Sequence, residues 1–136
     1  MRALKICLWI AGIACLLSLF GMVLPASSWQ SIAKFVGVES FPDAPQFIYA
    51  IRVGSGTYAG VGVFFIILAL APLKYGVMVP FSALGAVFIG VVCAIAGLIT
   101  AMPLWWFMGD SLSCLLLGAL ILVFWQQAKQ AVKNNK

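Results

Sequence analysis

The residue best suited to chemistry in this 136-residue chain is Arg52, the one charge well inside a long apolar stretch. An arginine at mid-bilayer costs at least about 2.5 kcal/mol, and near an interface it lowers that cost by snorkelling. Three roles are open: a depth anchor, an ion-pair partner of Asp110 or Glu39, and a ligand for the anionic or carbonyl group of a lipid, quinone or other hydrophobic molecule. In the third role, Tyr49, Tyr58 and Asp110 are its expected neighbours.

Groups for acid–base or nucleophilic catalysis are scarce. The chain has no histidine, no paired carboxylates in its apolar stretches and no glycine-rich phosphate loop. Ser18, Ser55, Ser82 and Ser113 have no base beside them, and a serine in a spanning helix usually bonds its own backbone. We therefore expect no enzyme activity, no catalytic residue, no metal site and no cofactor.

The four cysteines, Cys7, Cys15, Cys93 and Cys114, lie in apolar stretches and form no CxxC pair. Thiols in such places usually act as small hydrophobic side chains. A redox or metal role needs close partners, and Cys93 and Cys114 are predicted at different depths.

Composition indicates that hydrocarbon surrounds most of these residues. Hydrophobic residues make up 65% of the chain and charged ones 8%, against about 25% charged in soluble domains. A spanning helix needs roughly 20 mostly apolar residues. We predict a single all-α transmembrane domain over residues 1–136, a four-helix bundle with spans at about 4–24, 46–71, 77–101 and 111–127.

Two connecting segments carry further signals. Residues 27–30 fit a capping box, and Trp29 and Ile32 recur at helical spacing. This pattern predicts a short amphipathic helix in the membrane interface, with a polar loop as the alternative. Residues 104–109 are predicted to form an aromatic loop, after which Asp110 or Ser111 caps the fourth span.

The net charge of +5 follows a membrane pattern and not a nucleic-acid-binding one. Six of the eight basic residues flank the ends of the apolar stretches; they are Arg2, Lys5, Lys74, Lys129, Lys133 and Lys136. The acids Glu39, Asp43 and Asp110 fall on the other face. Because cytoplasmic flanks are enriched in Lys and Arg, both termini are expected in the cytoplasm, with the lysine-rich tail near anionic headgroups.

Tryptophans agree with this orientation. Trp29, Trp105 and Trp106 fall at the predicted outer interface, and Trp9 and Trp125 at the inner one. Because indole rings favour the headgroup level, all five are expected to be interface anchors.

Small residues predict how the spans pack, since helices in lipid associate through close backbone approach. Span two has a GxxxG motif, and span three has a stripe of small residues, so we expect these two spans in tight contact within one chain. The predicted packing residues are Gly54, Gly56, Gly60, Gly62, Ala86, Gly90, Ala94 and Gly97.

The segment Tyr49–Gly62 reads YAIRVGSGTYAGVG, an arginine followed by small residues, a tyrosine and glycines. With the four-span layout and the chain length, it resembles a family of small bacterial membrane proteins known only as a domain of unknown function. The resemblance covers nearly the whole chain. It implies a four-helix fold in a bacterial inner membrane and no established activity. Members often have a second arginine in the third span and an acid in the fourth, which this chain lacks.

The leading hypothesis is a non-catalytic accessory or stabilising subunit of a larger membrane complex, in contact with lipids and with other membrane subunits or itself. The alternative is a binding or carrier protein for a hydrophobic ligand, a lipid or quinone, held by Arg52. A third hypothesis is a small transporter or a thiol redox protein. Transport coupled to protons is disfavoured because no span contains an acid.

Overall fold

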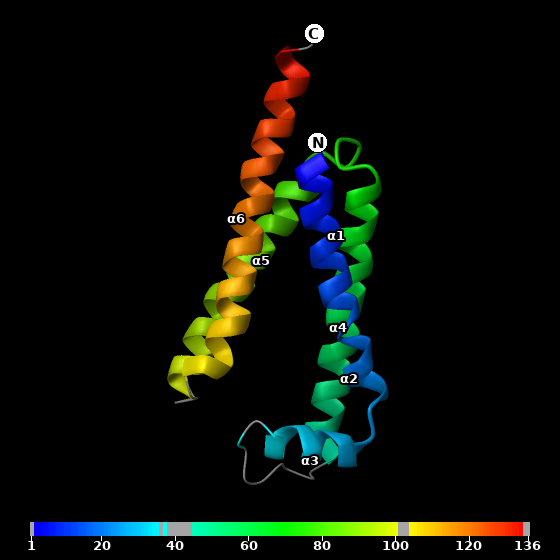
Figure 1. Cartoon of the computed structure of the whole chain (residues 1–136), viewed down its shortest axis with the longest axis vertical. Helices are drawn as coiled ribbons and strands as arrows, with labels where there is room; N and C mark the ends of the chain where they lie inside the picture. The colour runs from blue at the N-terminus through cyan, green and yellow to red at the C-terminus, as the bar shows by residue number, and fades with distance from the viewer. Residues whose placement is uncertain (1, 36, 38–44, 101–103, 135–136) are drawn as a thin grey trace. The chain divides into compact units, whose positions relative to one another are not determined.

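The computed structural model describes residues 2–35, 37, 45–100 and 104–134, which form six helices and no strand (Figure 1). The helices are α1 (Arg2–Leu16), α2 (Leu19–Val23), α3 (Ala26–Phe35), α4 (Pro45–Leu70), α5 (Met78–Ile99) and α6 (Leu104–Asn134). The all-α prediction is confirmed for this part of the chain. Glu39, Asp43 and Lys136 lie outside the described residues.

Four helical stretches of the described chain are long and apolar enough to cross a membrane: Arg2–Val23, Pro45–Leu70, Met78–Ile99 and Phe107–Asn134. Large side chains such as Phe81, Phe88 and Ile99 point outward from them and are exposed. Exposing such an apolar surface to water is unfavourable, whereas lipid chains can cover it. These features support a multi-pass membrane protein.

The first spanning stretch is interrupted, where the sequence predicts one helix. Leu17 and Ser18 form a turn between α1 and α2. The Ser18 and Phe20 amides donate to the carbonyls of Cys15 and Leu17, three residues back, at 3.2 and 3.1 Å. Such i to i−3 bonds tighten a helix locally, and the Ser18 hydroxyl competes for the same carbonyl of Cys15 at 2.6 Å.

The short helix after the first span forms, but its start differs from the prediction. Helix α3 begins at Ala26, so Ser27 lies inside it and is not the N-cap of a capping box. The carbonyl of Ser27 accepts a hydrogen bond from the Ser31 hydroxyl, as in a helix interior. Its position in the membrane interface stays a prediction.

Helix α6 is longer than the predicted fourth span at both ends. It begins at Leu104 and ends at Asn134, so the predicted aromatic loop at residues 104–109 is helical. The reason is local: residues 104–108 are good or moderate helix formers without proline, and the one glycine, Gly109, is tolerated inside a helix. Asp110 and Ser111 therefore lie within the helix and do not cap it.

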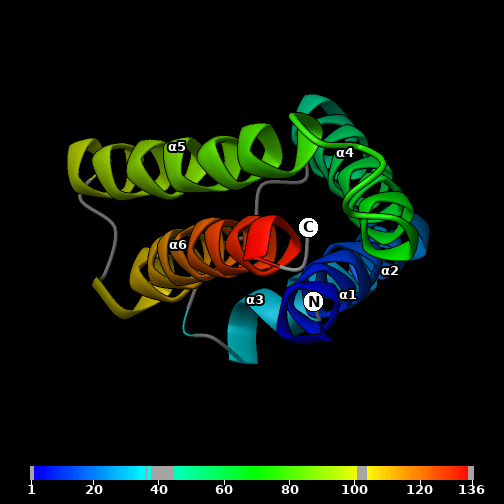
Figure 2. The ribbon, with the colours of Figure 1, turned by 90° about the horizontal axis from the view of Figure 1, so that it is seen from above.

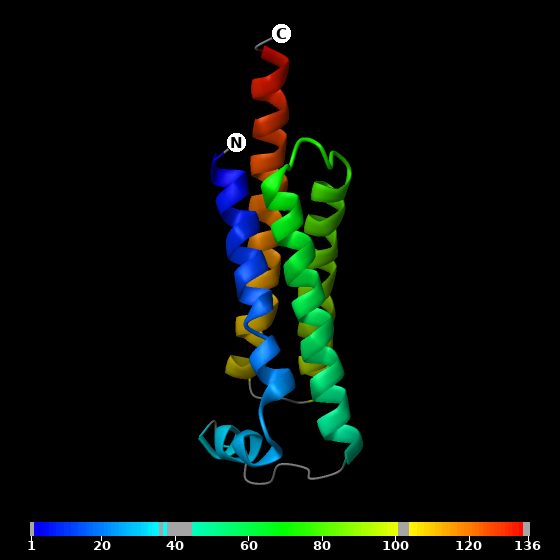
Figure 3. The same ribbon diagram turned by 90° about the vertical axis from the view of Figure 1, so that its right-hand side faces the viewer.

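The chain divides into two compact units. Unit 1 comprises Met1–Ala11 and Phe65–Lys136, and unit 2 comprises Gly12–Phe64. In unit 1, α5 and α6 run antiparallel and lie side by side (Figures 1 and 2). Buried side chains of this unit include Leu4, Leu8, Leu68, Val79 and Ile121. The start of α1, the turn after α4 and the second half of α6 lie at one end of unit 1 (Figure 3).

Candidate functional site

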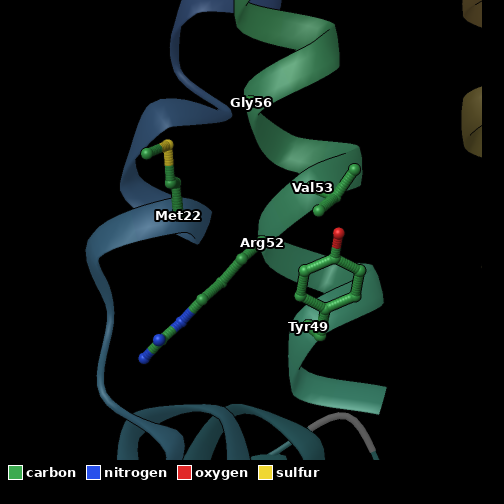
Figure 4. Close-up of a pocket in the computed structure, with 5 residues that line it drawn as sticks. All are labelled: Met22, Tyr49, Arg52, Val53 and Gly56. Carbon is green, nitrogen blue, oxygen red and sulfur yellow. The ribbon is translucent and has the colours of Figure 1, made fainter. Parts of the chain in front are cut away.

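Arg52 lines an open pocket of about 440 Å³ between α2 and α4 in unit 2, the Arg52 groove. Its other lining residues are Met22 from α2 and Tyr49, Val53 and Gly56 from α4. The Arg52 side chain extends away from α4 on the side of α2, and Tyr49 lies along α4 with its hydroxyl beside Val53 (Figure 4). One cationic head thus sits in a largely apolar groove.

The Arg52 guanidinium is exposed and has no ion-pair partner among the residues the structure describes. It lies seven residues past Pro45, the first residue of α4, which places it about 10 Å along the helix. A guanidinium carries five N–H donors. No described carboxylate takes up those donors.

Helix geometry explains which predicted neighbours join Arg52. Tyr49 precedes it by three residues, about 300° around the helix, and therefore lies on the same face. Tyr58 follows it by six residues, about 240° around, and does not line the groove. Asp110 belongs to unit 1, so the predicted site containing both charges is not formed within either unit.

Close packing between α2 and α4 fixes the wall of the Arg52 groove. The hydroxyl of Ser18 lies 2.8 Å from the carbonyl oxygen of Ser55, within donating distance, and it shares its single proton with the carbonyl of Cys15. A Cβ placed on Gly21 would lie 2.5 Å from the Ser55 hydroxyl oxygen and 3.3 Å from the indole of Trp29. A larger residue at this position would force the Ser55 side chain to rotate and would press on Trp29.

Another tight contact of unit 2 joins α4 to the end of α1. A Cβ on Gly62 would lie 2.7 Å from the carbonyl oxygen of Gly12 and 2.9 Å from the amide nitrogen of Leu16. Gly62 therefore packs against span one, whereas the sequence predicts that it meets span three. By contrast, Gly54 and Gly60 have open space where a Cβ would stand, and Gly56 faces Met22 at an ordinary 3.6 Å.

The stripe of small residues on α5 packs against α6. A Cβ on Gly90 would lie 3.0 Å from the Ser111 carbonyl oxygen, and one on Gly97 would overlap the ring of Phe107. The Ser111 hydroxyl donates to the Gly90 carbonyl at 2.8 Å. Ala86 and Ala94 of the same stripe are half-buried. Spans three and four are thus the pair that these residues hold together.

The predicted tryptophan anchors fall in different environments. Trp9 and Trp105 are exposed, and Trp29 is half-buried against Gly21. Their positions at an interface stay predictions. Trp125 is only 8% exposed, so it packs inside the protein. It continues the buried face that Ile121 begins one helical turn earlier. The side chain of Trp106 lies outside the described ones.

All four cysteine side chains are half-buried. No group of three or more His, Cys, Asp or Glu side chains gathers among the described residues in a way that would hold a metal ion. The serines behave largely as predicted, since Ser82 and Ser113 donate to carbonyls of their own helices. The sequence analysis did not predict that Met22 lines the groove or that Ser18 bonds the Ser55 carbonyl of another helix. For Ser18, the signal in the sequence was a hydroxyl inside an apolar span.

Comparisons with family models, with curated proteins and with solved structures found no match to this chain. The resemblance to an uncharacterised family of small bacterial membrane proteins therefore stays a prediction. Evidence for a function comes from the geometry of the Arg52 groove and from the two packed helix pairs.

Proposed function

We propose that this protein is a non-enzymatic membrane protein that binds one amphiphilic molecule, a lipid or a quinone, in the Arg52 groove. The observation that carries this proposal is an exposed guanidinium without an ion-pair partner among the described residues, on the wall of an otherwise mostly apolar pocket of about 440 Å³. If Arg52 only fixed the depth of its helix, no pocket beside it would be needed. If it formed an ion pair, it would need an acidic partner, and the described part of unit 2 offers none.

The chemistry of the lining defines the ligand. A guanidinium binds phosphate and carboxylate groups through paired N–H donors, and it also donates to carbonyl oxygens. Met22 and Val53 offer apolar surface beside it, and Gly56 leaves room for a chain or ring. The ligand expected here has one oxygen-rich head on Arg52 and a hydrophobic body along α2 and α4.

The setting proposed for this site is a bacterial inner membrane with both chain termini in the cytoplasm. The basic ends of the spans support this orientation, because cytoplasmic flanks are enriched in Lys and Arg. Arg52 is then near the outer end of its span, and α3 lies in the outer interface. From there the guanidinium reaches headgroups of the outer leaflet.

Arg52→Gln tests the proposal. The wild-type and variant proteins are purified in a mild detergent, and bound lipids and quinones are quantified by mass spectrometry. We expect the variant to lose the bound amphiphile by about tenfold or more while its helical content and elution volume stay unchanged. Lys34→Gln is the matched control, since Lys34 is an exposed cation of the same unit outside the groove. Full retention of the ligand by Arg52→Gln would reject the site.

A second candidate function is the accessory subunit of a larger membrane complex. The observation that favours it is open backbone on two spans: a Cβ on Gly60 or Gly85 meets no atom within 4 Å. Small residues of this kind let a helix of another chain approach closely. Crosslinking in native membranes followed by purification tests it; a lone monomer at native expression would count against this role.

A further inference from the structure

Unit 1 contains a second pocket, the dilysine groove, of about 300 Å³. It is lined by Lys129, Val132 and Lys133 of α6 and by Leu73 of the turn that follows α4. All four side chains are partly or fully exposed. The sequence predicts only that the lysine-rich tail lies near headgroups. In the structure, α6 and the turn after α4 together form a groove.

Helical spacing explains how α6 builds its side of the dilysine groove. Lys129 and Lys133 are four residues apart, and therefore lie on one face about one turn from each other. Trp125 and Ala128 are buried and hold this part of α6 against unit 1. This buried face positions the two lysines next to it, and neither lysine has an ion-pair partner among the described residues.

The turn after α4 builds the other side. Pro72 is fully buried, and the amide of Lys74 donates to the Ala71 carbonyl at 3.0 Å. Leu73, between them, is exposed at the groove. The turn thus supplies an apolar side chain at a fixed place next to two ammonium groups.

Apart from Asp110, every charged side chain that the structure describes in unit 1 is basic. Arg2 and Lys5 belong to the start of α1, and Lys74 belongs to the turn after α4. Both segments lie at the same end of unit 1 as the second half of α6 (Figure 3). The one acidic side chain in the sequence of unit 1 is Asp110. It stands nineteen residues before Lys129 on α6, about 28 Å away along the helix. No described carboxylate therefore neutralises the two lysines.

From this arrangement we infer that the dilysine groove binds the phosphate headgroup of an anionic phospholipid. The two ammonium groups hold phosphate oxygens, and Leu73 and Val132 contact the glycerol and the first carbons of the acyl chains. A headgroup with two phosphates, as in a diphosphatidylglycerol, engages both lysines at once and binds more tightly than one with a single phosphate. The apolar half of the lining favours a lipid over free phosphate or a nucleic acid.

This site does not depend on the Arg52 groove, because it uses other residues and belongs to the other unit. Arg52→Gln is expected to leave lipid binding at the dilysine groove unchanged. The two proposals can therefore fail separately.

Native mass spectrometry of the full-length, delipidated protein tests the inference. The probes are diphosphatidylglycerol, phosphatidylglycerol and zwitterionic phosphatidylcholine, added at equal concentration. Near a membrane surface one basic residue contributes about 1 kcal/mol, so Lys129→Gln and Lys133→Gln should each weaken diphosphatidylglycerol binding about fivefold and the double variant about twenty-five-fold. The double change to arginine should restore most of the affinity.

Lys5→Gln and Lys74→Gln are the matched controls, since each removes one charge from the same end of unit 1 without changing the lining. We expect losses below about twofold from either. Losses equal to that of Lys129→Gln would mean that diffuse charge attracts the lipid, and this would overturn the site. Equal binding of phosphatidylcholine, or equally effective competition by inorganic phosphate or a short oligonucleotide, would overturn it as well.

Discussion

The α5–α6 pair of unit 1 and the α2–α4 pair of unit 2 solve the same packing problem with different results. Both use a glycine and a serine to bring two helices together: Gly90 with Ser111 in the first pair, and Gly21 with Ser55 in the second. The α5–α6 contact extends over several turns, from Gly118 beside Ala83 to Gly97 beside Phe107. The α2–α4 contact is short, because α2 has five residues.

The length of the contact decides whether a helix pair leaves space for a ligand. Along α5 and α6, successive turns close against each other and the main-chain oxygens of Ser111 and Ala83 stand next to glycines. Between α2 and α4, the contact at Gly21 is followed by the open Arg52 groove. A long, repeated contact gives a rigid pair, whereas a single contact beside a groove gives a binding surface. This contrast supports a structural role for the first pair and the ligand binding proposed for the second.

The largest effect is expected where a new side chain would meet backbone, and Gly62→Val tests this in unit 2. The carbonyl of Gly12 and the amide of Leu16 cannot move without distorting α1, so the variant should lose about 3 kcal/mol of unfolding free energy. Gly60→Val in the same helix has open space and should cost under about 1 kcal/mol. Unfolding in mixed micelles, followed by circular dichroism, measures both. Equal losses would show that unit 2 is packed no more tightly at Gly62 than at Gly60.

An intermediate effect is expected in the α5–α6 pair from Gly97→Ala. The added methyl group meets the Phe107 ring, which has to rotate, and overpacking of this kind costs about 1–3 kcal/mol. Gly85→Ala on the same helix meets no atom within 4 Å and should stabilise the helix by about 0.5–1 kcal/mol. Changes of opposite sign in the unfolding free energy of the two variants would show that α5 has one closely packed face and one open face. A stabilising Gly97→Ala would contradict a rigid α5–α6 pair.

The smallest effects concern the two serine hydroxyls that cross between helices. Ser111 is buried and its bond to Gly90 should contribute about 0.6 kcal/mol, as interhelical bonds in membranes do on average. Ser18→Ala removes a similar bond but also relieves the competition for the Cys15 carbonyl, so its net cost should stay below that of Ser111→Ala. Hydrogen exchange at residues 17–21 should slow in Ser18→Ala. A cost for Ser18→Ala above 1 kcal/mol would reverse the comparison.

The sequence was sufficient to predict the second and third spans, whose observed bounds differ from the predicted ones by a few residues. The turn at Leu17 and Ser18 was missed because it involves a hydrogen bond to Ser55, which is 37 positions distant in sequence. The start of α6 was missed because an aromatic run at a predicted interface is equally compatible with a loop and with a helix. Local patterns do not distinguish these cases.

The candidate site was predicted only in part. Arg52 and Tyr49 share a face by helical spacing alone, and both line the groove. Tyr58 does not line the groove, because six residues of helix separate it from Arg52 and turn it to another face. This spacing can be read from the sequence as well. Met22 was not predictable, because it comes from another helix whose position depends on the turn at Ser18. Likewise the glycines indicate that helices approach closely, but not which helix each glycine meets.

The length of α6 has a practical consequence. Its 31 residues extend about 46 Å, whereas the hydrocarbon core of a bilayer is about 30 Å thick. The surplus is expected to bring Lys129 and Lys133 to the level of the lipid headgroups as a continuous helix. A fluorophore joined after Asn134 would therefore stand one residue from Lys133 and should report on lipid that arrives at the dilysine groove.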